Sequence, residues 1–342
     1  MKKTIKIKFI GFWDGFVDSD NFIYNTLAKH YDLEFSDEPD YLFYSSFCPH
    51  SFDFVLYDCV RIYYSGENTS PDFNFCDYAI GFDNLTYEDR FLNFPLFLIY
   101  RQLPCACDKH KCVDMSLLKS KGEFANFIVG NAQGLSERTE LFEKLSEYKP
   151  VASVGTYLNN REGFTVKNEE EKLSFQNSCR FSITVESVRQ SGFVTEKILH
   201  AFAAKTVPIY FGNDKIDDIF NPNSFINCHN YSDFNQVVSR VKEVEENPQL
   251  WLEMVSTPCF KSPTYPEDKW ADFEKFLLNI VNQPLEKAYR RPMKFHTQRY
   301  DKELKTFMSM RDNVRFRRFL VANNNFFVRL ALKIFGSSAD GN

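Results

Sequence analysis

The sequence lacks any apolar run long enough to cross a membrane. Its longest such run, Phe94–Tyr100, is far shorter than the roughly 20 residues that a spanning helix needs. The first residues, MKKTIKIKFIGFW, also lack the continuous apolar core of a signal peptide, because Lys6 and Lys8 interrupt it and the apolar residues alternate as in a strand. These absences predict a cytoplasmic protein whose chain begins with a strand.

Cysteine pairing is not expected either. The chain has nine cysteines, an odd number scattered along the sequence, which is typical of a reducing compartment and not of a disulfide framework. One cluster, formed by Cys105, Cys107, His110 and Cys112, has enough soft ligands to hold zinc. The alternative is a reduced surface loop. The spacing is not that of a usual zinc finger and no second half-site follows, which favours the loop.

The sequence has no internal repeat, no low-complexity tract and a single Asp-x-Asp motif, Asp18-Ser19-Asp20. That motif precedes an expected helix, so we interpret it as capping and not as metal binding. Aromatic residues are abundant at 17% of the chain. They indicate either a phenylalanine-rich core or a surface that packs against sugar rings, and composition alone favours the core.

Positive charge is concentrated at the C-terminal end. The net charge is −5, yet residues 285–335 hold 13 Lys and Arg against 4 Asp and Glu. Apolar residues there recur at helical spacing among the basic ones: Phe316, Phe319, Leu320, Phe327, Leu330, Ala331 and Ile334. This pattern predicts amphipathic helices lying on an anionic membrane surface at the inner face. Docking of this tail on the acidic body of the protein is the alternative, and no nucleic-acid partner is expected.

The rest of the chain alternates strands with helices, which predicts parallel, doubly wound sheets. We expect a first Rossmann-like domain over residues 1–149, a second over 150–284 and the basic tail over 285–342. Ligands of such sheets bind beyond the carboxyl ends of the strands. The strands are expected at Ile5–Phe9, Tyr41–Tyr44, Arg61–Tyr64, Tyr78–Gly81, Asn126–Val129, Arg180–Val185, Val207–Phe211 and Phe225–Asn227.

One strand-to-helix segment has the features of an anion site. Strand Arg180–Val185 leads through Glu186 and Ser187 to Gly192-Phe193-Val194-Thr195-Glu196-Lys197, where a helix is expected to start. Free backbone N–H groups and the helix dipole attract anions there. Lys197 in the first turn opposes the dipole, which a bound anion would resolve. The alternative reading is an ordinary N-cap at Thr195 followed by a solvated lysine.

This segment also carries a family resemblance. Residues 181–231, which include VTEKILHAF, TVPIYFG and FNPNSFIN, resemble the donor-binding motif of family 10 glycosyltransferases, the α-1,3/4-fucosyltransferases. Residues 61–97, beginning RIYYSGENTSPDFNF, resemble the acceptor-side segment of the bacterial members. The resemblance implies a GT-B fold, with two Rossmann-like domains facing across a cleft. It also implies an enzyme that makes Lewis-type glycans without a required metal or other cofactor.

The resemblance also implies roles for individual residues. Glu67 takes the place of the general base, Arg138 and Lys197 those of the cations that hold the donor pyrophosphate, and Glu196 that of a carboxylate near the fucose. Glu186 belongs to the family's Phe-Glu-Asn turn. Without the resemblance, Glu67 would be read as a turn carboxylate and Arg138 as a helix-surface charge.

Two positions depart from the family pattern. Ser187 replaces the usual Asn and Phe193 the usual Tyr, and each change removes hydrogen-bonding capacity at the expected donor site. The reaction implied is inverting transfer of fucose from GDP-fucose to GlcNAc or glucose in a Gal-GlcNAc-type glycan. A transferase for another nucleotide sugar and a non-catalytic nucleotide-sugar-binding relative remain alternatives.

Overall fold

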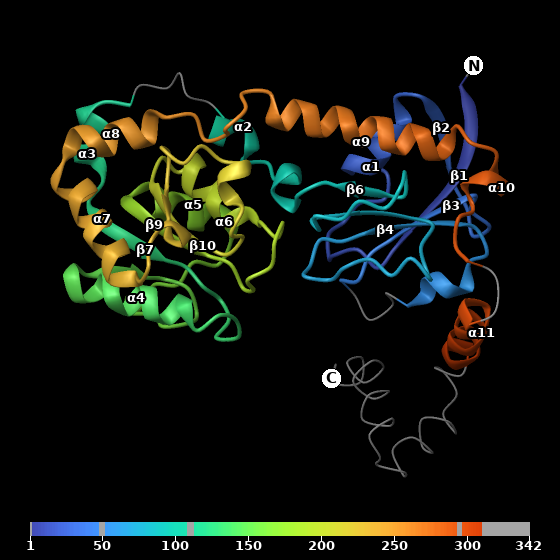
Figure 1. Cartoon of the computed structure of the whole chain (residues 1–342), viewed down its shortest axis with the longest axis horizontal. Helices are drawn as coiled ribbons and strands as arrows, with labels where there is room; N and C mark the ends of the chain where they lie inside the picture. Colours follow the sequence, from blue (N-terminus) through green and yellow to red (C-terminus); the bar gives the residue numbers. More distant parts are fainter. Residues whose placement is uncertain (1, 48–51, 108–112, 293–295, 310–342) are drawn as a thin grey trace, which may run out of the picture. The chain divides into compact units, whose positions relative to one another are not determined.

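The computed structural model of the protein describes residues 2–47, 52–107, 113–292 and 296–309 (Figure 1). These residues form two compact units. The first unit contains residues up to 81, residues 85–94 and the described residues from 270 onward, and the second contains residues 82–84 and 95–269.

The first unit is built on a six-stranded sheet in which every strand runs parallel to its neighbours, in the order β2-β1-β3-β4-β5-β6. The central strands β3, β4 and β5 are buried along their whole length, as expected for parallel strands covered on both faces. The six strands are β1 (Lys3–Ile10), β2 (Tyr31–Phe35), β3 (Tyr41–Tyr44), β4 (Val60–Tyr64), β5 (Tyr78–Gly81) and β6 (Phe91–Asn93).

The sequence did not predict the two edge strands. β2 reads YDLEF and is mostly exposed, so it lacks the apolar run that marks a buried strand. β6 has three residues, too few for a period to appear. Pairing with β1 defines β2 as a strand, and pairing with β5 defines β6.

Helix α1 (Phe22–Ala28) follows β1, and Asn21 is its N-cap residue. The Asn21 side chain accepts hydrogen bonds from the N–H groups of Ile23 and Tyr24. The Asp18-Ser19-Asp20 motif does precede this helix, but the cap is Asn21, because only the residue directly before the first helical one has its side chain within reach of those N–H groups.

The start of the predicted tail belongs to the first unit. Helices α10 (Leu285–Ala288) and α11 (His296–Ser309) follow α9 (Tyr265–Val281). Arg291 forms a buried ion pair with Asp77, and Arg61 Nη1 donates to Asp301 Oδ1 at 3.0 Å. Pro284 therefore does not end the globular region, since buried charges fasten the chain beyond it to the sheet. The amphipathic helices expected over residues 316–334 lie outside the described residues.

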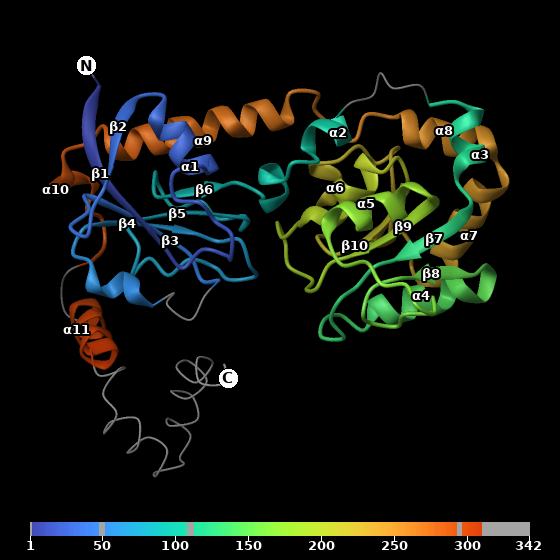
Figure 2. The same cartoon turned by 180° about the vertical axis from the view of Figure 1, so that it is seen from behind.

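The second unit is built on a five-stranded parallel sheet in the order β11-β10-β9-β7-β8. Helices cover both of its faces, as in a doubly wound Rossmann-like sheet (Figures 1 and 2). The strands are β7 (Glu123–Phe127), β8 (Val151–Ser153), β9 (Cys179–Val185), β10 (Val207–Phe211) and β11 (Ile226–Asn227). The helices are α2 (Leu103–Cys107), α3 (Met115–Ser120), α4 (Glu137–Tyr148), α5 (Glu169–Asn177), α6 (Glu196–Ala203), α7 (Phe234–Glu246) and α8 (Pro248–Ser256).

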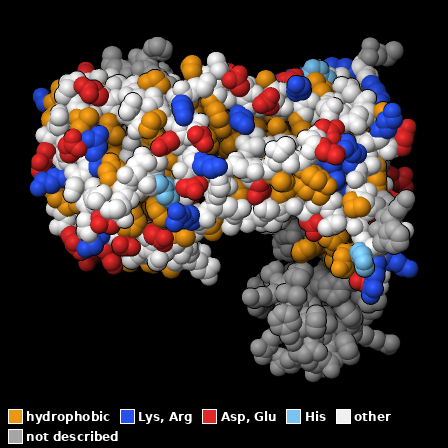
Figure 3. Space-filling model, viewed as in Figure 1, with side chains coloured by type: hydrophobic (Ala, Val, Ile, Leu, Met, Phe, Trp, Pro, Cys, Tyr) orange, Lys and Arg blue, Asp and Glu red, His pale blue; other side chains and the backbone are white. Residues whose placement is uncertain are grey.

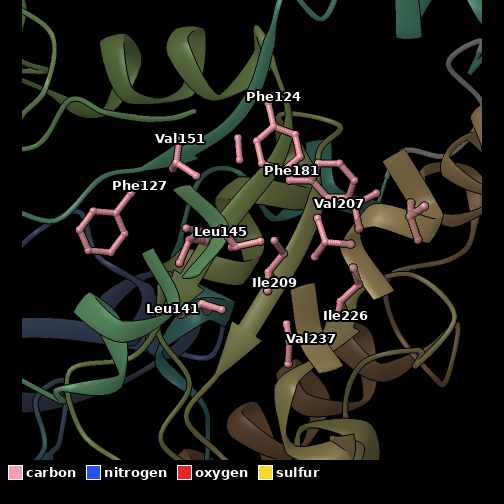
Figure 4. Packing of buried hydrophobic residues seen from close by; sticks show 14 of the residues in the cluster. Phe124, Phe127, Leu141, Leu145, Val151, Phe181, Val207, Ile209, Ile226 and Val237 are labelled. Carbon is pink, nitrogen blue, oxygen red and sulfur yellow. The ribbon is translucent and has the colours of Figure 1, made fainter. Parts of the chain in front are cut away.

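The core of the second unit lies between this sheet and the helices α4, α7 and α8. Phe181 and Ile209 of the central strands pack with Leu141 and Leu145 of α4 and Val237 of α7 (Figure 4). Burial of an apolar side chain of this size is worth about 1.5–3 kcal/mol. This packing fixes the positions of the strand ends, where the predicted site residues lie.

The division between the units differs from the predicted one at residue 150. β7 pairs with both β8 and β9, so it belongs to the second sheet although it precedes the predicted boundary. The start of α9 lies in the second unit and its remainder, from Trp270, in the first. Periodicity along the chain could not show that β7 belongs to the second unit or that α9 is shared between the units. The sheet to which a strand belongs depends on pairing with strands far away in the sequence. The facing arrangement of two domains implied by the resemblance stays a prediction.

None of the helices in the described part of the chain is long and apolar enough to span a membrane. On the face seen in Figure 3, acidic and basic side chains are intermixed.

Candidate functional site

The order in which the chain adds strands to the second sheet reverses at β7, although all the strands are parallel. We call this point the strand reversal. From this strand the chain continues to β8 on one side, whereas β9, β10 and β11 lie on the other. Ligands of open α/β sheets bind beyond the carboxyl ends of the strands at such a reversal. The segment after β7 leads into α4, which carries Arg138, and the segment after β9 carries Glu186 and leads into α6 with Glu196 and Lys197.

Glu186 is the centre of the hydrogen-bond network at this point. It comes directly after β9 and is completely buried. Its Oε1 accepts from the Thr195 N–H at 2.8 Å, and its Oε2 accepts from the Thr195 hydroxyl at 2.7 Å. A carboxylate that receives these bonds holds the start of α6 against the end of β9. Glu186 is therefore a positioning residue in this structure.

Lys197 is fixed by the same network. Its Nζ donates to Glu186 Oε2 at 3.1 Å and to Thr195 Oγ1 at 2.8 Å, while Glu196 Oε1 lies 3.8 Å away. Burial alone would lower the pKa of the Lys197 ammonium, but Glu186 and Glu196 outweigh burial and raise it above the ordinary value. A protonated lysine is thus held at the first turn of α6.

The ordinary-cap interpretation of Thr195 is not what the structure shows. Thr195 is the N-cap residue of α6, but its side chain makes no capping hydrogen bond. Its hydroxyl bridges Glu186 and Lys197 instead. Lys197 is likewise not simply solvated, because these partners hold its ammonium group.

Glu196 is the first residue of α6 and pairs with Lys172 of α5, whose Nζ lies 3.4 Å from Glu196 Oε1. Burial alone would raise the pKa of Glu196. Lys197 and Lys172 outweigh burial and hold that pKa well below its usual range. Glu196 is therefore a carboxylate at neutral pH, placed beside the helix N-terminus where negative charge is favourable.

Arg138 joins the network from the other side of the strand reversal. It is buried in α4, and its Nε donates to the Glu186 carbonyl at 3.0 Å while Nη1 donates to the Gln133 carbonyl at 3.3 Å. Burial lowers the pKa of its guanidinium from the ordinary value, against the effect of Glu186 and Glu196, yet arginine stays protonated at neutral pH. It is not the exposed helix-surface charge of the alternative interpretation.

Gly134 permits this approach. Its φ of +140° lies in a region that favours glycine, and a Cβ atom there would come within 2.7 Å of Arg138 Nη1 and 3.3 Å of the Ser187 carbonyl. A side chain at this position would separate the segments that follow β7 and β9.

The charges of this network do not cancel. Arg138, Lys172 and Lys197 are cationic, whereas Glu186 and Glu196 are the carboxylates among them. The excess of positive charge lies at the N-terminus of α6, beyond the strand ends. Fixed cations and a helix N-terminus together make a site that suits a phosphate-bearing ligand.

Two predicted donor-site residues lie at the edge of this network. Ser187 follows Glu186, and its carbonyl approaches Gly134. Phe193 is buried, with its ring packed edge-on against Phe82 at a centroid distance of 5.0 Å. Phe193 therefore contributes packing within the second unit, and a donor contact by its ring stays a prediction.

Glu67 belongs to the first unit and lies in the turn after β4, with its side chain exposed. The turn is fixed by Ser65, whose hydroxyl donates to the Glu67 carbonyl at 2.9 Å, and by the Thr69 N–H, which donates to the same carbonyl at 2.7 Å. The carboxylate thus stands on a constrained turn at the carboxyl end of a central strand. Its predicted proximity to the residues of the second unit stays a prediction.

Sequence reasoning assigned no role to three contributors to the network, although residues 212–217 were expected to lie at a strand end where ligands bind. Lys172 pairs with Glu196 from a different helix, and nothing in its local sequence signals that contact. Gly212 ends β10 directly beside Glu186, and Asn213, which is buried, accepts from the Gly192 N–H at 3.1 Å. The position of the Gly212-Asn213 pair at the end of a predicted strand was the one signal available.

The possible zinc cluster lies partly outside the described residues, since His110 and Cys112 fall there. Cys105 is exposed in α2, and Cys107 is half-buried. Across the residues that the structure describes, no group of three or more metal-ligating side chains comes together.

Comparison with known proteins agrees with this architecture. The family model "Alpha-(1,3)-fucosyltransferase FucT N-terminal domain" matches residues 7–100. The family model "Glycosyltransferase family 10 (fucosyltransferase) C-term" matches residues 118–256, which include Arg138 and the Glu186–Lys197 segment.

Similar proteins and structures come from the same group. The α-(1,3)-fucosyltransferase FucT of Helicobacter pylori is 31% identical over 225 residues, which are 57% of this chain and 46% of that protein. Human 4-galactosyl-N-acetylglucosaminide 3-alpha-L-fucosyltransferase 9 is 23% identical over 135 residues, which are 39% of this chain and 36% of that protein. The chain thus aligns with less than half the length of these curated relatives.

A crystal structure of an α1,3-fucosyltransferase superposes with a TM-score of 0.65 at 25% identity, covering 81% of this chain and 90% of that one. A crystal structure of α1,3-fucosyltransferase with GDP superposes equally well at 25% identity, covering 83% and 92%. With the two family models matching well over half of its residues between them, the chain belongs to glycosyltransferase family 10, the fucosyltransferases.

Proposed function

We propose that this protein transfers L-fucose from GDP-β-L-fucose to a hydroxyl group of GlcNAc or glucose in a Gal-GlcNAc-type glycan, with inversion and with α-1,3 or α-1,4 linkage. The observation that carries this proposal is the cation network around Glu186 at the strand reversal of the second unit. Membership of family 10 and the names of its relatives support fucose as the sugar.

In this proposal the network binds the pyrophosphate of the donor. Among the described residues, Glu186 and Thr195 use two of the three N–H groups of Lys197, so the third can be offered to a phosphate oxygen. Arg138 uses Nε and Nη1 on carbonyl groups, which leaves further N–H groups of the guanidinium for a second phosphate oxygen. Both cations are held before the donor arrives, so little ordering is needed on binding.

The transfer step needs one base and one stabilised leaving group. Glu67 takes the proton of the acceptor hydroxyl as its oxygen bonds to the anomeric carbon of fucose, and the bond from that carbon to the β-phosphate oxygen breaks. Arg138 and Lys197 stabilise the negative charge that GDP gains. Glu196, a carboxylate at neutral pH, stabilises the positive charge that develops on the sugar ring. The protein's own residues supply each of these roles without a divalent metal.

The alternatives are a transferase for another nucleotide sugar and a relative that binds without catalysis. Ser187 offers fewer hydrogen bonds than the usual Asn, and Phe193 offers none where Tyr is usual, so other donors should be tested. The decisive experiment measures release of the nucleoside diphosphate, GDP or UDP, from a panel of GDP- and UDP-sugars, with N-acetyllactosamine, its β1-3 isomer and lactose as acceptors. Release from GDP-fucose alone supports the proposal, release from another donor overturns the choice of sugar, and binding without release overturns catalysis.

We further propose that the basic tail holds the protein at the inner, anionic face of a membrane. The basic and apolar spacing of residues 311–342 supports this. Deleting these residues keeps the anchored helix α11, so activity on a soluble acceptor should persist while binding to phosphatidylserine vesicles is lost. Equal vesicle binding with and without residues 311–342 would contradict the proposal and favour docking on the protein body.

A further inference from the structure

A group of aromatic side chains gathers at one edge of the first sheet. Trp13 lies in the loop after β1, Phe47 in the loop after β3, and Tyr64 at the end of β4. These three strands are neighbours and run parallel, so their carboxyl ends share one edge. The Trp13 ring centroid lies 5.4 Å from that of Phe47, 5.1 Å from that of Phe16 and 6.4 Å from that of Tyr64.

Some rings of this group are buried in the core and others are half-buried at its surface. Phe12 and Tyr64 are 7% and 1% exposed and belong to the core. Trp13, Phe16 and Phe47 are only half-buried, and we call these three the aromatic shelf. A purely structural cluster would gain more by burying them, since each fully buried aromatic side chain contributes about 1.5–3 kcal/mol.

The aromatic shelf adjoins the turn that carries Glu67. A Cβ atom on Gly66 would lie 2.5 Å from the Phe47 ring, so only glycine lets the turn pass this ring so closely. Glu67 is the next residue, and Ser65 fixes the turn through its bond to the Glu67 carbonyl. Glu67, whose side chain is exposed, is therefore the residue directly after Gly66, which packs on the Phe47 ring of the shelf.

We propose that the aromatic shelf binds the acceptor sugar, with Trp13 and Phe47 against the apolar face of a pyranose ring whose reacting hydroxyl reaches Glu67. Aromatic rings offer a large rigid apolar surface, which matches the C–H face of a sugar and leaves its hydroxyl groups in water. Carboxylates directly follow Trp13 and Gly66 in the chain, namely Asp14 and Glu67. The shelf therefore favours neutral over sialylated or sulfated acceptors. This inference rests on the proposed function for the identity of the reaction.

The kinetic test is Trp13→Ala. We expect the KM for N-acetyllactosamine to rise about tenfold or more, which is the scale of one lost aromatic contact with its buried area, while kcat and the GDP affinity stay within about twofold. Trp13→Phe keeps a ring and should recover most of the acceptor affinity. Tyr300→Ala, which removes an exposed aromatic ring from α11, is the matched control and should change none of these values. An unchanged acceptor KM in Trp13→Ala, with transfer intact, overturns the inference.

A binding measurement separates this inference from the proposed function. The chain has three tryptophans, and Trp251 is buried in the second unit. Addition of N-acetyllactosamine with GDP present should change the tryptophan fluorescence of the wild type and of Trp270→Phe, but not that of Trp13→Phe. Sialylated N-acetyllactosamine should give a weaker change. Saccharide binding through Trp13 without any fucose transfer would overturn the proposed function alone, whereas an equal fluorescence change in all three proteins would overturn the shelf.

Discussion

The Lys197 ammonium donates to Glu186 Oε2 at 3.1 Å, and the Glu186 carboxyl that receives it is completely buried. Glu186 therefore has no exposed surface to offer a donor sugar in this structure. Glu186 contributes to the site by positioning other residues. Its carboxylate accepts hydrogen bonds from Lys197 and Thr195, and its backbone carbonyl accepts one from Arg138. The residue that the family resemblance places in a donor-binding turn acts here as the support for the cations.

Replacing Glu186 by Gln tests this support. The amide keeps the shape but loses the charge that faces Lys197, so we expect the free energy of unfolding to fall by about 1–3 kcal/mol, the usual effect of a lost hydrogen bond to a charged group. GDP affinity should fall with it, because Lys197 loses its fixed position. Chemical denaturation and calorimetry measure the two effects. Glu140→Gln, an exposed position on α4, is the control, and equal stability of the two variants would contradict the positioning role.

Gly212→Ala also tests whether Glu186 positions the cations, and it does so without changing any charge. A Cβ atom at Gly212 would lie 2.6 Å from Glu186 Cγ and 2.9 Å from the Tyr210 hydroxyl, so Glu186 must move. We expect a loss of about 1–3 kcal/mol of stability, as for other overpacked sites, together with weaker GDP binding. Gly122→Ala is the matched control, since a Cβ atom there meets nothing within 4 Å. A Gly212→Ala protein that binds GDP like the wild type would show that the network tolerates displacement of Glu186.

The sequence predicted the parts of this site that depend on local pattern. The apolar run at Val207–Phe211 and the turn chemistry around Glu186 placed both strand ends correctly, and Arg138, Glu186, Glu196 and Lys197 do share one network. Local pattern could not show that Glu186 is buried, that Lys172 reaches Glu196 or that Phe193 packs on Phe82. Those facts depend on contacts between residues far apart in the chain, which one sequence without pairing information does not contain.

The same limit explains the boundary between the units. β7 looked like the last strand of the first domain because it precedes α4 and residue 150. Its partner is β9, more than fifty residues further along, and that pairing assigns it to the second sheet.

The charge on Glu196 should make stability depend on pH in the acid range. Its pKa is lowered in the folded protein below the ordinary 4.5, so its stabilising effect is full above that value and is lost as the pH falls. Lys197 has a raised pKa, so its effect persists until the pH exceeds 10.5. The difference in melting temperature between the wild type and Glu196→Gln should therefore be constant from about pH 6 to 9 and shrink below pH 4.5. A difference that stays the same at pH 3.5 would show that the charge of Glu196 is not involved.

Arg138→Ala should weaken the binding of GDP in the ground state. The guanidinium is held by two carbonyl groups and offers its other N–H groups to phosphate, so its loss should reduce GDP affinity about 10- to 100-fold, the range of one or two charge-assisted hydrogen bonds. Transfer should slow as well, since the phosphate charge grows as GDP departs. Arg161→Ala, which removes an exposed arginine of the same unit, is the control. GDP affinity equal to that of the wild type would exclude Arg138 from the phosphate site.

Glu67→Gln should slow transfer without weakening the binding of GDP. Glu67 lies in the first unit, outside the cation network, so GDP affinity by calorimetry should stay near that of the wild type. Loss of the general base should lower kcat about 10²–10⁴-fold, which corresponds to about 2.7–5.5 kcal/mol of barrier. The bonds that Ser65 and Thr69 donate to the backbone carbonyl of Glu67 are the same in the glutamine variant, so they should still fix the turn.

The control for Glu67→Gln is Glu34→Gln, which neutralises an exposed carboxylate on the edge strand β2 and should leave kcat unchanged. A base also makes the rate depend on pH, so the acid limb of the kcat profile seen in the wild type should disappear in Glu67→Gln. Near-normal turnover in Glu67→Gln would mean that another carboxylate takes the proton. Glu186 is fully buried and bound on both oxygens, so it cannot serve without rearrangement. Glu196, part-exposed at the start of α6, would then be the residue to replace next.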